Sequence, residues 1–172
     1  TGIAAINAGG VTIHSFFQVP FAPYVPESSF SADGKATYRF RYGKEKINII
    51  RSIDLLVIDE ISMVRADLLD SVDAVLRRFR DRNKPFGGVQ LLMIGDLQQL
   101  SPVVKDDEWQ MLRKYYDTPY FFSSQALKQT EYCTIELKKV YRQNDGTFLE
   151  LLNRIRENRC DGQVLEALNR RY

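Results

Sequence analysis

Two carboxylates follow a short apolar run in Ile53–Ser62, and their position suits phosphate chemistry. The apolar residues Leu55–Ile58 predict a strand buried on both faces of a parallel sheet. Asp59 and Glu60 would then lie at the carboxyl edge of that sheet, where open α/β folds bind ligands. One acid can hold Mg²⁺ on a nucleotide, and the next can polarise the attacking water. The pattern is that of a Walker B motif or, taken alone, of an ordinary strand end with solvated charges.

A second apolar run, Val89–Ile94, ends in a polar sequence that suits the same chemistry. Gly95 permits tight backbone geometry beside a ligand, and Asp96 can accept backbone N–H groups of the following turn. The amide of Gln98 or Gln99 can bond a γ-phosphate oxygen or the attacking water. A simple polar turn explains this segment equally well when it is taken alone. Two such strand ends together favour a nucleotide site.

A third strand is expected over Tyr132–Leu137, and Arg142 follows it. The planar guanidinium of Arg142 can neutralise a phosphate in the transition state. A nucleotide site of this kind also needs the phosphate loop G-x-x-x-x-G-K-[ST]. The Gly-Lys pairs at 34–35 and 43–44 do not fit that pattern. The phosphate loop is therefore expected upstream of Thr1, or the protein has none.

Helices must connect these strands and position their ends. Apolar residues recur at helical spacing from Leu68 to Phe79, which predicts an amphipathic helix over Ala66–Asp81. Thr147 and Glu150 have capping-box spacing at the start of a later helix. Strands separated by helices imply right-handed βαβ units and a parallel sheet, so the expected fold class is α/β. We also expect helices over Lys44–Ser52, Asp107–Tyr116, Ser123–Gln129, Thr147–Asn158 and Asp161–Arg171, and an extended piece over Thr12–Phe16.

Length and composition limit the class of protein. The 172 residues, 44% hydrophobic and 27% charged, suffice for one globular domain with a core. Cys133 and Cys160 are too few for a disulfide framework or a cysteine-built metal site, which favours reduced thiols inside a cell. No apolar run approaches a membrane span, and no signal peptide is visible. The chain opens on Thr-Gly-Ile, so we expect a fragment of a longer protein.

The formal net charge of +2 indicates no partner, but one segment is locally basic. Lys35–Arg51 carries six basic residues, one acid and several aromatic rings. Such a segment suits the backbone and bases of a single nucleic-acid strand, and it equally suits a solvated hairpin.

The order of these motifs resembles the petite-integration-frequency (PIF) DNA helicases, which are RecD-like superfamily-one motors. The matching sequences are those of Thr1–Phe17, D-E-I-S-M, F-G-G-V-Q-L-L-M-I-G-D-L-Q-Q-L-S-P-V, Y-R-Q and the family's signature segment Glu60–Arg80. They extend from the first residue to about Arg156. The resemblance implies that residues 1–172 form a parallel-sheet RecA-like P-loop NTPase lobe, incomplete because the leading strand and phosphate loop are missing. Ser101 departs mildly from the family, which often has proline there.

The resemblance also implies roles for matching residues. Asp59 corresponds to the Mg²⁺ ligand and Glu60 to the catalytic base. Gln99, rather than Gln98, corresponds to the glutamine that senses the γ-phosphate. Arg142 corresponds to an arginine that contacts the γ-phosphate across the cleft between two motor lobes. The implied contacts to single-stranded DNA are Thr1, Gly2, His14, Ser15 and Phe16.

The segment Gln18–Gly43 contains three prolines and an Asp-Gly turn, which indicates an inserted hairpin or loop. It resembles the small wedge element that helps part a duplex. The implied parent is an ATP- and Mg²⁺-dependent helicase that moves 5′ to 3′ on single strands and acts on forks. It would be intracellular: cytoplasmic or nucleoid-associated in bacteria, nuclear or mitochondrial in eukaryotes. The fragment alone is expected to be inactive. The alternatives are an ATPase-inactive nucleic-acid-binding module and a RecD-type subunit of a recombination nuclease.

Overall fold

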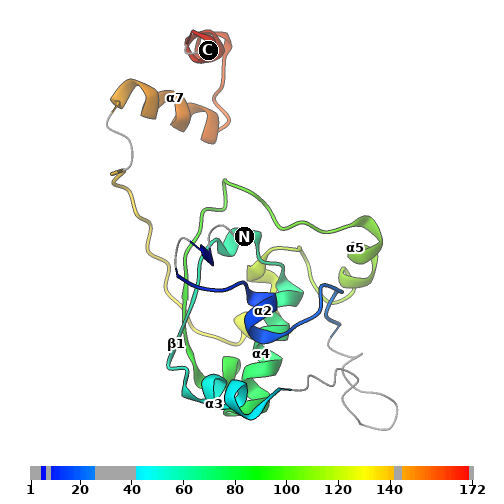
Figure 1. Cartoon of the computed structure of the whole chain (residues 1–172). Coiled ribbons are helices and arrows are strands. Elements are labelled where there is room, and N and C mark those ends of the chain that lie inside the picture. Colours follow the sequence, from blue (N-terminus) through cyan, green and yellow to red (C-terminus); the bar gives the residue numbers. More distant parts are fainter. Residues whose placement is uncertain (1–4, 7–8, 26–41, 142–144, 171–172) are drawn as a thin grey trace. The chain divides into compact units, whose positions relative to one another are not determined.

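The computed structural model describes residues 5–6, 9–25, 42–141 and 145–170, and the chain divides into two compact units after Tyr132 (Figure 1). The first unit contains α2 (Ile13–Phe17), α3 (Lys44–Ser52), β1 (Leu55–Ile58), η2 (Ile61–Met63), α4 (Ala66–Phe79), η3 (Pro85–Gly88), β2 (Gln90–Met93), α5 (Asp106–Leu112), η4 (Phe121–Ser123) and α6 (Gln125–Lys128). The second contains α7 (Gly146–Arg156) and α8 (Gly162–Asn169). Elements labelled η are 3₁₀ helices.

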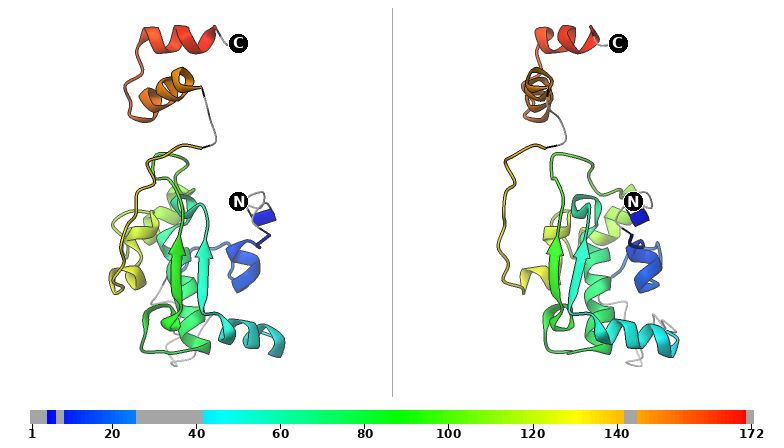
Figure 2. Two further views of the ribbon diagram at one scale, coloured as in Figure 1. Left: turned by 90° about the vertical axis from the view of Figure 1, so that its left-hand side faces the viewer. Right: turned by 60° about the vertical axis from the view of Figure 1, so that its left-hand side comes forward.

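The two strands form a parallel pair joined by a helical crossover. Leu55 pairs with Gln90 and Ile58 with Met93, so the strands are in register over their whole length. Figure 2 shows the strands side by side and pointing the same way, with α4 on one side of them. Both predicted strands, the predicted helix between them and the α/β class are confirmed.

One face of this sheet is packed and the other is open. The packed face joins the core of α4, which includes Leu56, Ile58, Leu91, Met93, Leu69, Val72, Val75 and Leu76. On the other face Leu55, Val57 and Leu92 are 49%, 50% and 46% exposed. The prediction that β1 is buried on both faces is therefore wrong for the described residues, because α4 covers a single face. A parallel sheet is ordinarily covered on both.

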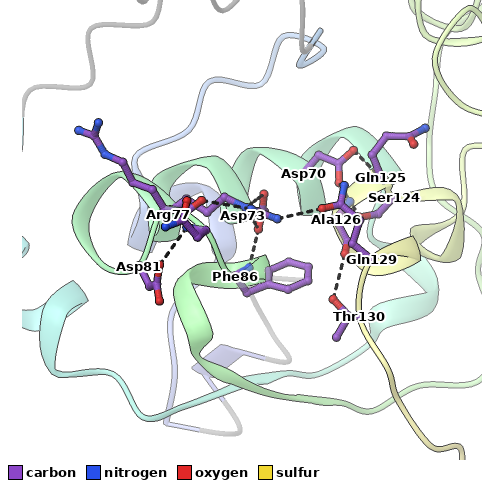
Figure 3. Close-up of polar contacts among 12 residues, drawn as sticks. Asp70, Asp73, Arg77, Asp81, Phe86, Ser124, Gln125, Ala126, Gln129 and Thr130 are labelled. Atoms are coloured by element: carbon purple, nitrogen blue, oxygen red, sulfur yellow. Dashed lines mark hydrogen bonds and ion pairs between the residues drawn. The ribbon is translucent and has the colours of Figure 1, made fainter.

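Two carboxylates of α4 hold neighbouring segments against the core (Figure 3). Asp70 is 5% exposed and accepts four hydrogen bonds, three of them from the start of α6. Its donors are the Tyr116 hydroxyl at 2.9 Å, the Ser124 hydroxyl at 2.5 Å, and the backbone N–H groups of Gln125 and Ala126 at 3.0 Å. The buried charge is thus compensated by donors from segments more than forty residues away in the sequence.

Asp73 fixes the turn that leads into β2. Its Oδ1 accepts the backbone N–H of Phe86 at 2.5 Å, and both oxygens accept Nε of Arg77. Phe86 and Gly87 have left-handed φ values of 51° and 62°. A Cβ at Gly87 would lie 2.8 Å from the Leu76 carbonyl oxygen, so the turn packs directly on the end of α4. This turn fixes where β2 begins, and therefore which residues of β2 pair with β1.

The expected third strand over Tyr132–Leu137 is wrong. This segment forms no strand, and Ile135 and Leu137 are 79% and 88% exposed. Its sequence has the apolar alternation of a strand, but a strand exists only where a neighbour accepts and donates its backbone hydrogen bonds. Within the ranges given above, no such neighbour pairs with it.

The expected extended piece over Thr12–Phe16 is also wrong, because the helix α2 occupies it. Thr12 has extended φ and ψ and acts as the N-cap, with its hydroxyl accepting the backbone N–H of Ser15 at 3.3 Å. Phe17 is buried in the core at the end of this single helical turn. Capping and burial of one aromatic ring decide the conformation here.

The remaining helices follow the predictions, with shifted ends. The capping box of Thr147 and Glu150 is wrong, because α7 begins at Gly146 and is capped by Asp145, whose side chain accepts the Phe148 N–H at 3.0 Å. Asp161 is the N-cap of α8, with its side chain accepting the Val164 N–H at 3.0 Å. In the portion of the chain that the structure describes, no helix has the length and apolar character needed to span a membrane.

Candidate nucleotide and nucleic-acid sites

The ends of β1 and β2 meet at one edge of the sheet. The backbone N–H of Ile94 donates to the Ile58 carbonyl at 2.9 Å, and the N–H of Ile61 donates back to the Ile94 carbonyl at 2.9 Å. Gly95 makes this approach possible, since a Cβ there would lie 2.9 Å from Cγ2 of Ile61 and 3.0 Å from its nitrogen. The polar residues that follow the two strands therefore share one edge.

Glu60 has a strained backbone at this edge. Its φ and ψ are 54° and 44°, a left-handed conformation that costs a residue with a Cβ roughly 1–2 kcal/mol. Its N–H donates to Oδ1 of Asp59 at 2.9 Å. Asp59 is exposed and Glu60 half-buried, so both carboxylates are accessible from solvent. Strain of this kind is concentrated at functional sites.

The acid pair suits a magnesium ion that is held mostly by a nucleotide. Among described residues, the recorded contact of Asp59 uses Oδ1, which leaves Oδ2 for an ion. The described residues contain no cluster of three or more His, Cys, Asp or Glu side chains arranged to hold a metal by themselves. Mg²⁺ commonly takes one or two protein carboxylates and completes its shell with water and phosphate oxygens. The donor set therefore fits Mg²⁺ on a phosphate better than a metal site built wholly from protein.

The loop after β2 holds an amide beside the acids. Asp96 Oδ1 accepts the backbone N–H of Gln98 at 3.0 Å, which confirms the predicted turn. Its Oδ2 accepts Nε2 of Gln99 at 3.1 Å, and Gln99 is exposed. The Gln99 side chain is thus oriented by Asp96 on the sheet edge that carries Asp59. Its contact with a γ-phosphate stays a prediction.

Several predicted site residues lie outside the described residues. They are Thr1, Gly2 and Arg142, together with positions 26–41 of the expected insertion. The structure therefore brings together two of the three expected strand ends, and the convergence of Arg142 with them stays a prediction.

The three described residues of the expected DNA-contacting segment lie in different surroundings. Ser15 is exposed on α2. The Phe16 ring packs edge-on against Phe17, with Nζ of Lys46 3.7 Å from its centroid. His14 stacks on Phe21, with ring centroids 4.5 Å apart and planes inclined by 19°. Ser15 is therefore exposed to a nucleic-acid strand, whereas His14 and Phe16 are both half-buried.

His14 and Phe21 border a cavity of about 230 Å³ between α2 and the start of α4. Arg65 and Asp67 also line this cavity and form a two-pronged ion pair, with both N···O distances 2.8 Å. Phe21, Arg65 and Asp67 were not predicted as site residues from the sequence. An aromatic residue between two prolines, and an acid two residues after an arginine at a helix start, are the sequence signals for them.

The charges around this cavity are balanced. Arg65 also donates to Oε2 of Glu108 at 2.8 Å, and Asp67 Oδ2 accepts the Tyr24 N–H at 2.9 Å. Burial lowers the pKa of Arg65, but its bonds to Asp67 and its attraction to Glu108 outweigh burial and raise that pKa overall. Burial and the nearby Arg65 charge lower the pKa of His14, so its imidazole is neutral at pH 7.

The chain is similar to known helicases over almost its whole length. The family model described as PIF1-like helicase matches residues 1–164. The ATP-dependent DNA helicase PIF1 of Homo sapiens is 40% identical and aligns with 98% of this chain and 24% of its own length. The helicase of the same name from Saccharomyces cerevisiae is 38% identical over 95% of this chain and 18% of its own. The chain thus spans about a quarter or less of these relatives.

Solved structures give the same result. Pif1 helicase from Bacteroides, crystallised with ADP-AlF3 and single-stranded DNA, is 42% identical, with a TM-score of 0.89 over 96% of this chain and 37% of that one. Pif1 helicase from Candida albicans is 31% identical, with a TM-score of 0.70 over 97% of this chain and 34% of that one. The match confirms the expectation of a partial α/β, RecA-like lobe with a parallel sheet.

Proposed function

Because the chain belongs to the PIF1-like helicase family, we propose that it forms most of the first motor lobe of an ATP-dependent DNA helicase. The parent moves 5′ to 3′ on single-stranded DNA and unwinds duplexes. The observation that carries the proposal is the pair of backbone hydrogen bonds joining Ile58, Ile94 and Ile61. They bring an acid pair and an oriented amide to one sheet edge, where α/β proteins bind nucleotides.

The proposed chemistry is phosphoryl transfer to water. Asp59 would hold Mg²⁺, which would neutralise charge on the phosphates of the bound nucleotide, and Glu60 orients and deprotonates the attacking water. Gln99 bonds the γ-phosphate or that water, so its position reports whether the phosphate is present. Arg142 neutralises charge on the γ-phosphate from its place near the second motor lobe.

ATP and Mg²⁺ are the proposed cofactors. A Bacteroides relative was crystallised with ADP-AlF3, which supports a nucleotide at the corresponding site of this family. Any Mg²⁺ would be neutralised by Asp59 and by phosphate oxygens that the nucleotide supplies. The phosphate loop that cradles those oxygens is proposed to precede Thr1 in the parent.

Single-stranded and forked DNA are the proposed partners. Pif1 helicase from Bacteroides was solved with single-stranded DNA, and a further Pif1 structure concerns unwinding at forked duplex DNA, which supports both. Thr1, Gly2, His14 and Ser15 contact the strand, and Phe16 supports α2 from the core side. The insertion Gln18–Gly43 acts as a wedge at the fork. A DNA substrate implies action inside the cell, in the nucleus or mitochondrion if the source is eukaryotic.

The 172 residues alone are proposed to be inactive, because positioning and charge neutralisation supply nearly all the catalysis of phosphoryl transfer. The test compares ATP hydrolysis by this chain and by a longer protein that adds the upstream and downstream sequence. The longer protein is expected to hydrolyse ATP, faster with single-stranded DNA, and to unwind a duplex carrying a 5′ tail. DNA-stimulated turnover by the 172 residues would refute the inactivity. No turnover by the longer protein would favour a nucleic-acid-binding module without ATPase activity.

A further inference from the structure

Phe21 presents an aromatic ring to solvent. It is 82% exposed, although it stacks on His14 at a centroid distance of 4.5 Å. The stack with His14 is the one ring contact of Phe21 among the described residues, and most of the side chain is exposed. Successive planar rings extend such a stack favourably, and proteins use exposed aromatic rings in this way to hold unpaired bases. An open ring at the end of a stack is therefore a platform for one further planar group.

The cavity beside the stack has the composition of a small-ligand pocket. Its apolar walls come from Val19, Pro20, Met63, Leu68 and Val103. Its charged side chains, Arg65 and Asp67, form an ion pair, and its other polar side chains are those of His14, Tyr24 and Ser71. Pockets with mostly apolar walls and a few polar groups bind a flat organic group and fix its orientation through hydrogen bonds.

The balanced charges decide which part of a nucleotide this pocket suits. Arg65 already bonds Asp67 and Glu108, so the described residues that line the pocket offer no uncompensated cation for a phosphate. The lowered pKa of His14 keeps that ring neutral as well. A phosphate would lose its hydration without gaining a counter-charge, which is unfavourable. An uncharged base loses little hydration and gains both stacking and hydrogen-bond partners.

The pocket lies next to residues that are proposed to contact the DNA strand. His14 lines the pocket, and the exposed Ser15 follows it on α2. We propose that the pocket bordered by Phe21, His14 and Arg65 captures one unpaired base of a single DNA strand whose backbone passes Ser15. This inference rests on the proposed DNA contacts and adds a specific base site to them. Phe21 is the stacking residue, and the Arg65–Asp67 pair positions the pocket wall.

Binding of the 172-residue chain to two fluorescein-labelled oligonucleotides tests the proposal. One is oligo(dT), and the other has the same phosphates with abasic sugars in its central part. The variants are Phe21→Ala, Phe21→Trp and the control Phe122→Ala, which removes another partly exposed stacked ring. Phe21→Ala is expected to weaken binding to oligo(dT) roughly 5- to 150-fold, the effect of losing one base–aromatic stack. Phe21→Trp and Phe122→Ala should bind as the unmodified chain does.

The abasic strand separates this inference from the proposed function. The unmodified chain should bind abasic DNA about as weakly as Phe21→Ala binds oligo(dT), and Phe21→Ala should weaken abasic binding no further. If the chain binds both strands equally, or Phe21→Ala matches Phe122→Ala, the base site is refuted while the DNA contacts stand. If the chain binds neither strand, the proposed DNA contacts of this segment fail and the base site fails with them. Circular dichroism verifies that each variant is folded.

Discussion

Two groups of carboxylates in the first unit differ in how they are used. Asp70 and Asp73 lie within α4, where Asp70 accepts hydrogen bonds from four donors and Asp73 accepts them from the Phe86 N–H and Arg77 Nε. Asp59 and Glu60 follow β1, are accessible to solvent, and have a single recorded bond between them among the described residues. The first pair stabilises the fold. The second pair retains unused acceptor capacity at a sheet edge, as a metal and water site requires.

Backbone strain differs in the same way. Phe86 and Gly87 are left-handed at the start of β2, but this turn is buried and Asp73 holds it. Glu60 is left-handed at the end of β1 with no comparable clamp in the described residues. Strain that packing and hydrogen bonds compensate is structural, whereas strain at a solvent-accessible acid is expected at a functional site. The difference distinguishes the proposed catalytic edge of the sheet from the edge where β2 begins.

The largest effect on stability is expected from Asp70→Ala. It leaves four donors without their acceptor, two of them backbone N–H groups, and should lower the free energy of unfolding by about 3–5 kcal/mol. Asp59→Ala, at the other group of acids, should change it by less than about 0.5 kcal/mol. Urea denaturation measures both. If both substitutions lower the free energy of unfolding equally, the two groups of carboxylates do not differ in their contribution to stability.

Gly87→Ala should be the next most destabilising change, lowering the free energy of unfolding by about 2–4 kcal/mol. The added Cβ would lie 2.8 Å from the Leu76 carbonyl oxygen in a left-handed backbone, so η3 and α4 must separate. In the control Gly10→Ala the Cβ meets only the Ala5 carbonyl oxygen, at 3.8 Å. Thermal melts of both variants test this, and a Gly87→Ala melt that matches the control would show that the turn is not tightly packed.

Glu60→Gly should stabilise the chain by about 0.5–1 kcal/mol, since glycine relieves the left-handed strain and its extra unfolded-state entropy offsets part of the gain. Function would be lost at the same position, because the acid is removed. Urea denaturation of the 172 residues measures the change. A destabilised Glu60→Gly variant would contradict the idea that strain is stored at the catalytic edge.

The smallest effect concerns pH and His14. Burial and the Arg65 charge lower its folded-state pKa below the ordinary 6.5, while Asp67 opposes them. Its contribution to stability is therefore fully present above pH 6.5 and is lost as pH falls through the folded pKa. His14→Phe retains a ring against Phe21 and cannot titrate, so its stability should depend less on pH between 6.5 and 4.5. The free energy of unfolding of both proteins is measured across this pH range. If it falls equally with pH in the two proteins, the prediction is wrong.

Local patterns predicted the elements that pack locally. The apolar spacing of Ala66–Asp81 predicted α4, and the two apolar runs predicted β1 and β2 with their shared edge. The expected strand at Tyr132–Leu137 failed because pairing depends on a neighbour, which the spacing of one segment cannot supply. Strand propensity alone does not make a strand.

Conformations set by tertiary contact could not be predicted. The residues around Glu60 do not predict a left-handed backbone at this position. That conformation occurs where η2 follows β1 directly. Phe21 lies in a stretch that was interpreted only as an insertion, and its stack on His14 depends on how the chain returns to α2. The motif pattern thus predicted the strand ends that carry the acids and the amide, while the left-handed backbone of Glu60 and the pocket beside His14 required the structure.

The central claim is that the edge following β1 and β2 hydrolyses a nucleotide. Turnover of ATP by the longer protein carrying Glu60→Gln tests it most directly, because this change keeps the shape of the side chain and removes the base. The account predicts a loss of turnover of about 10²- to 10⁴-fold, with binding of a fluorescent ATP analogue retained. Undiminished turnover in this variant would contradict the account.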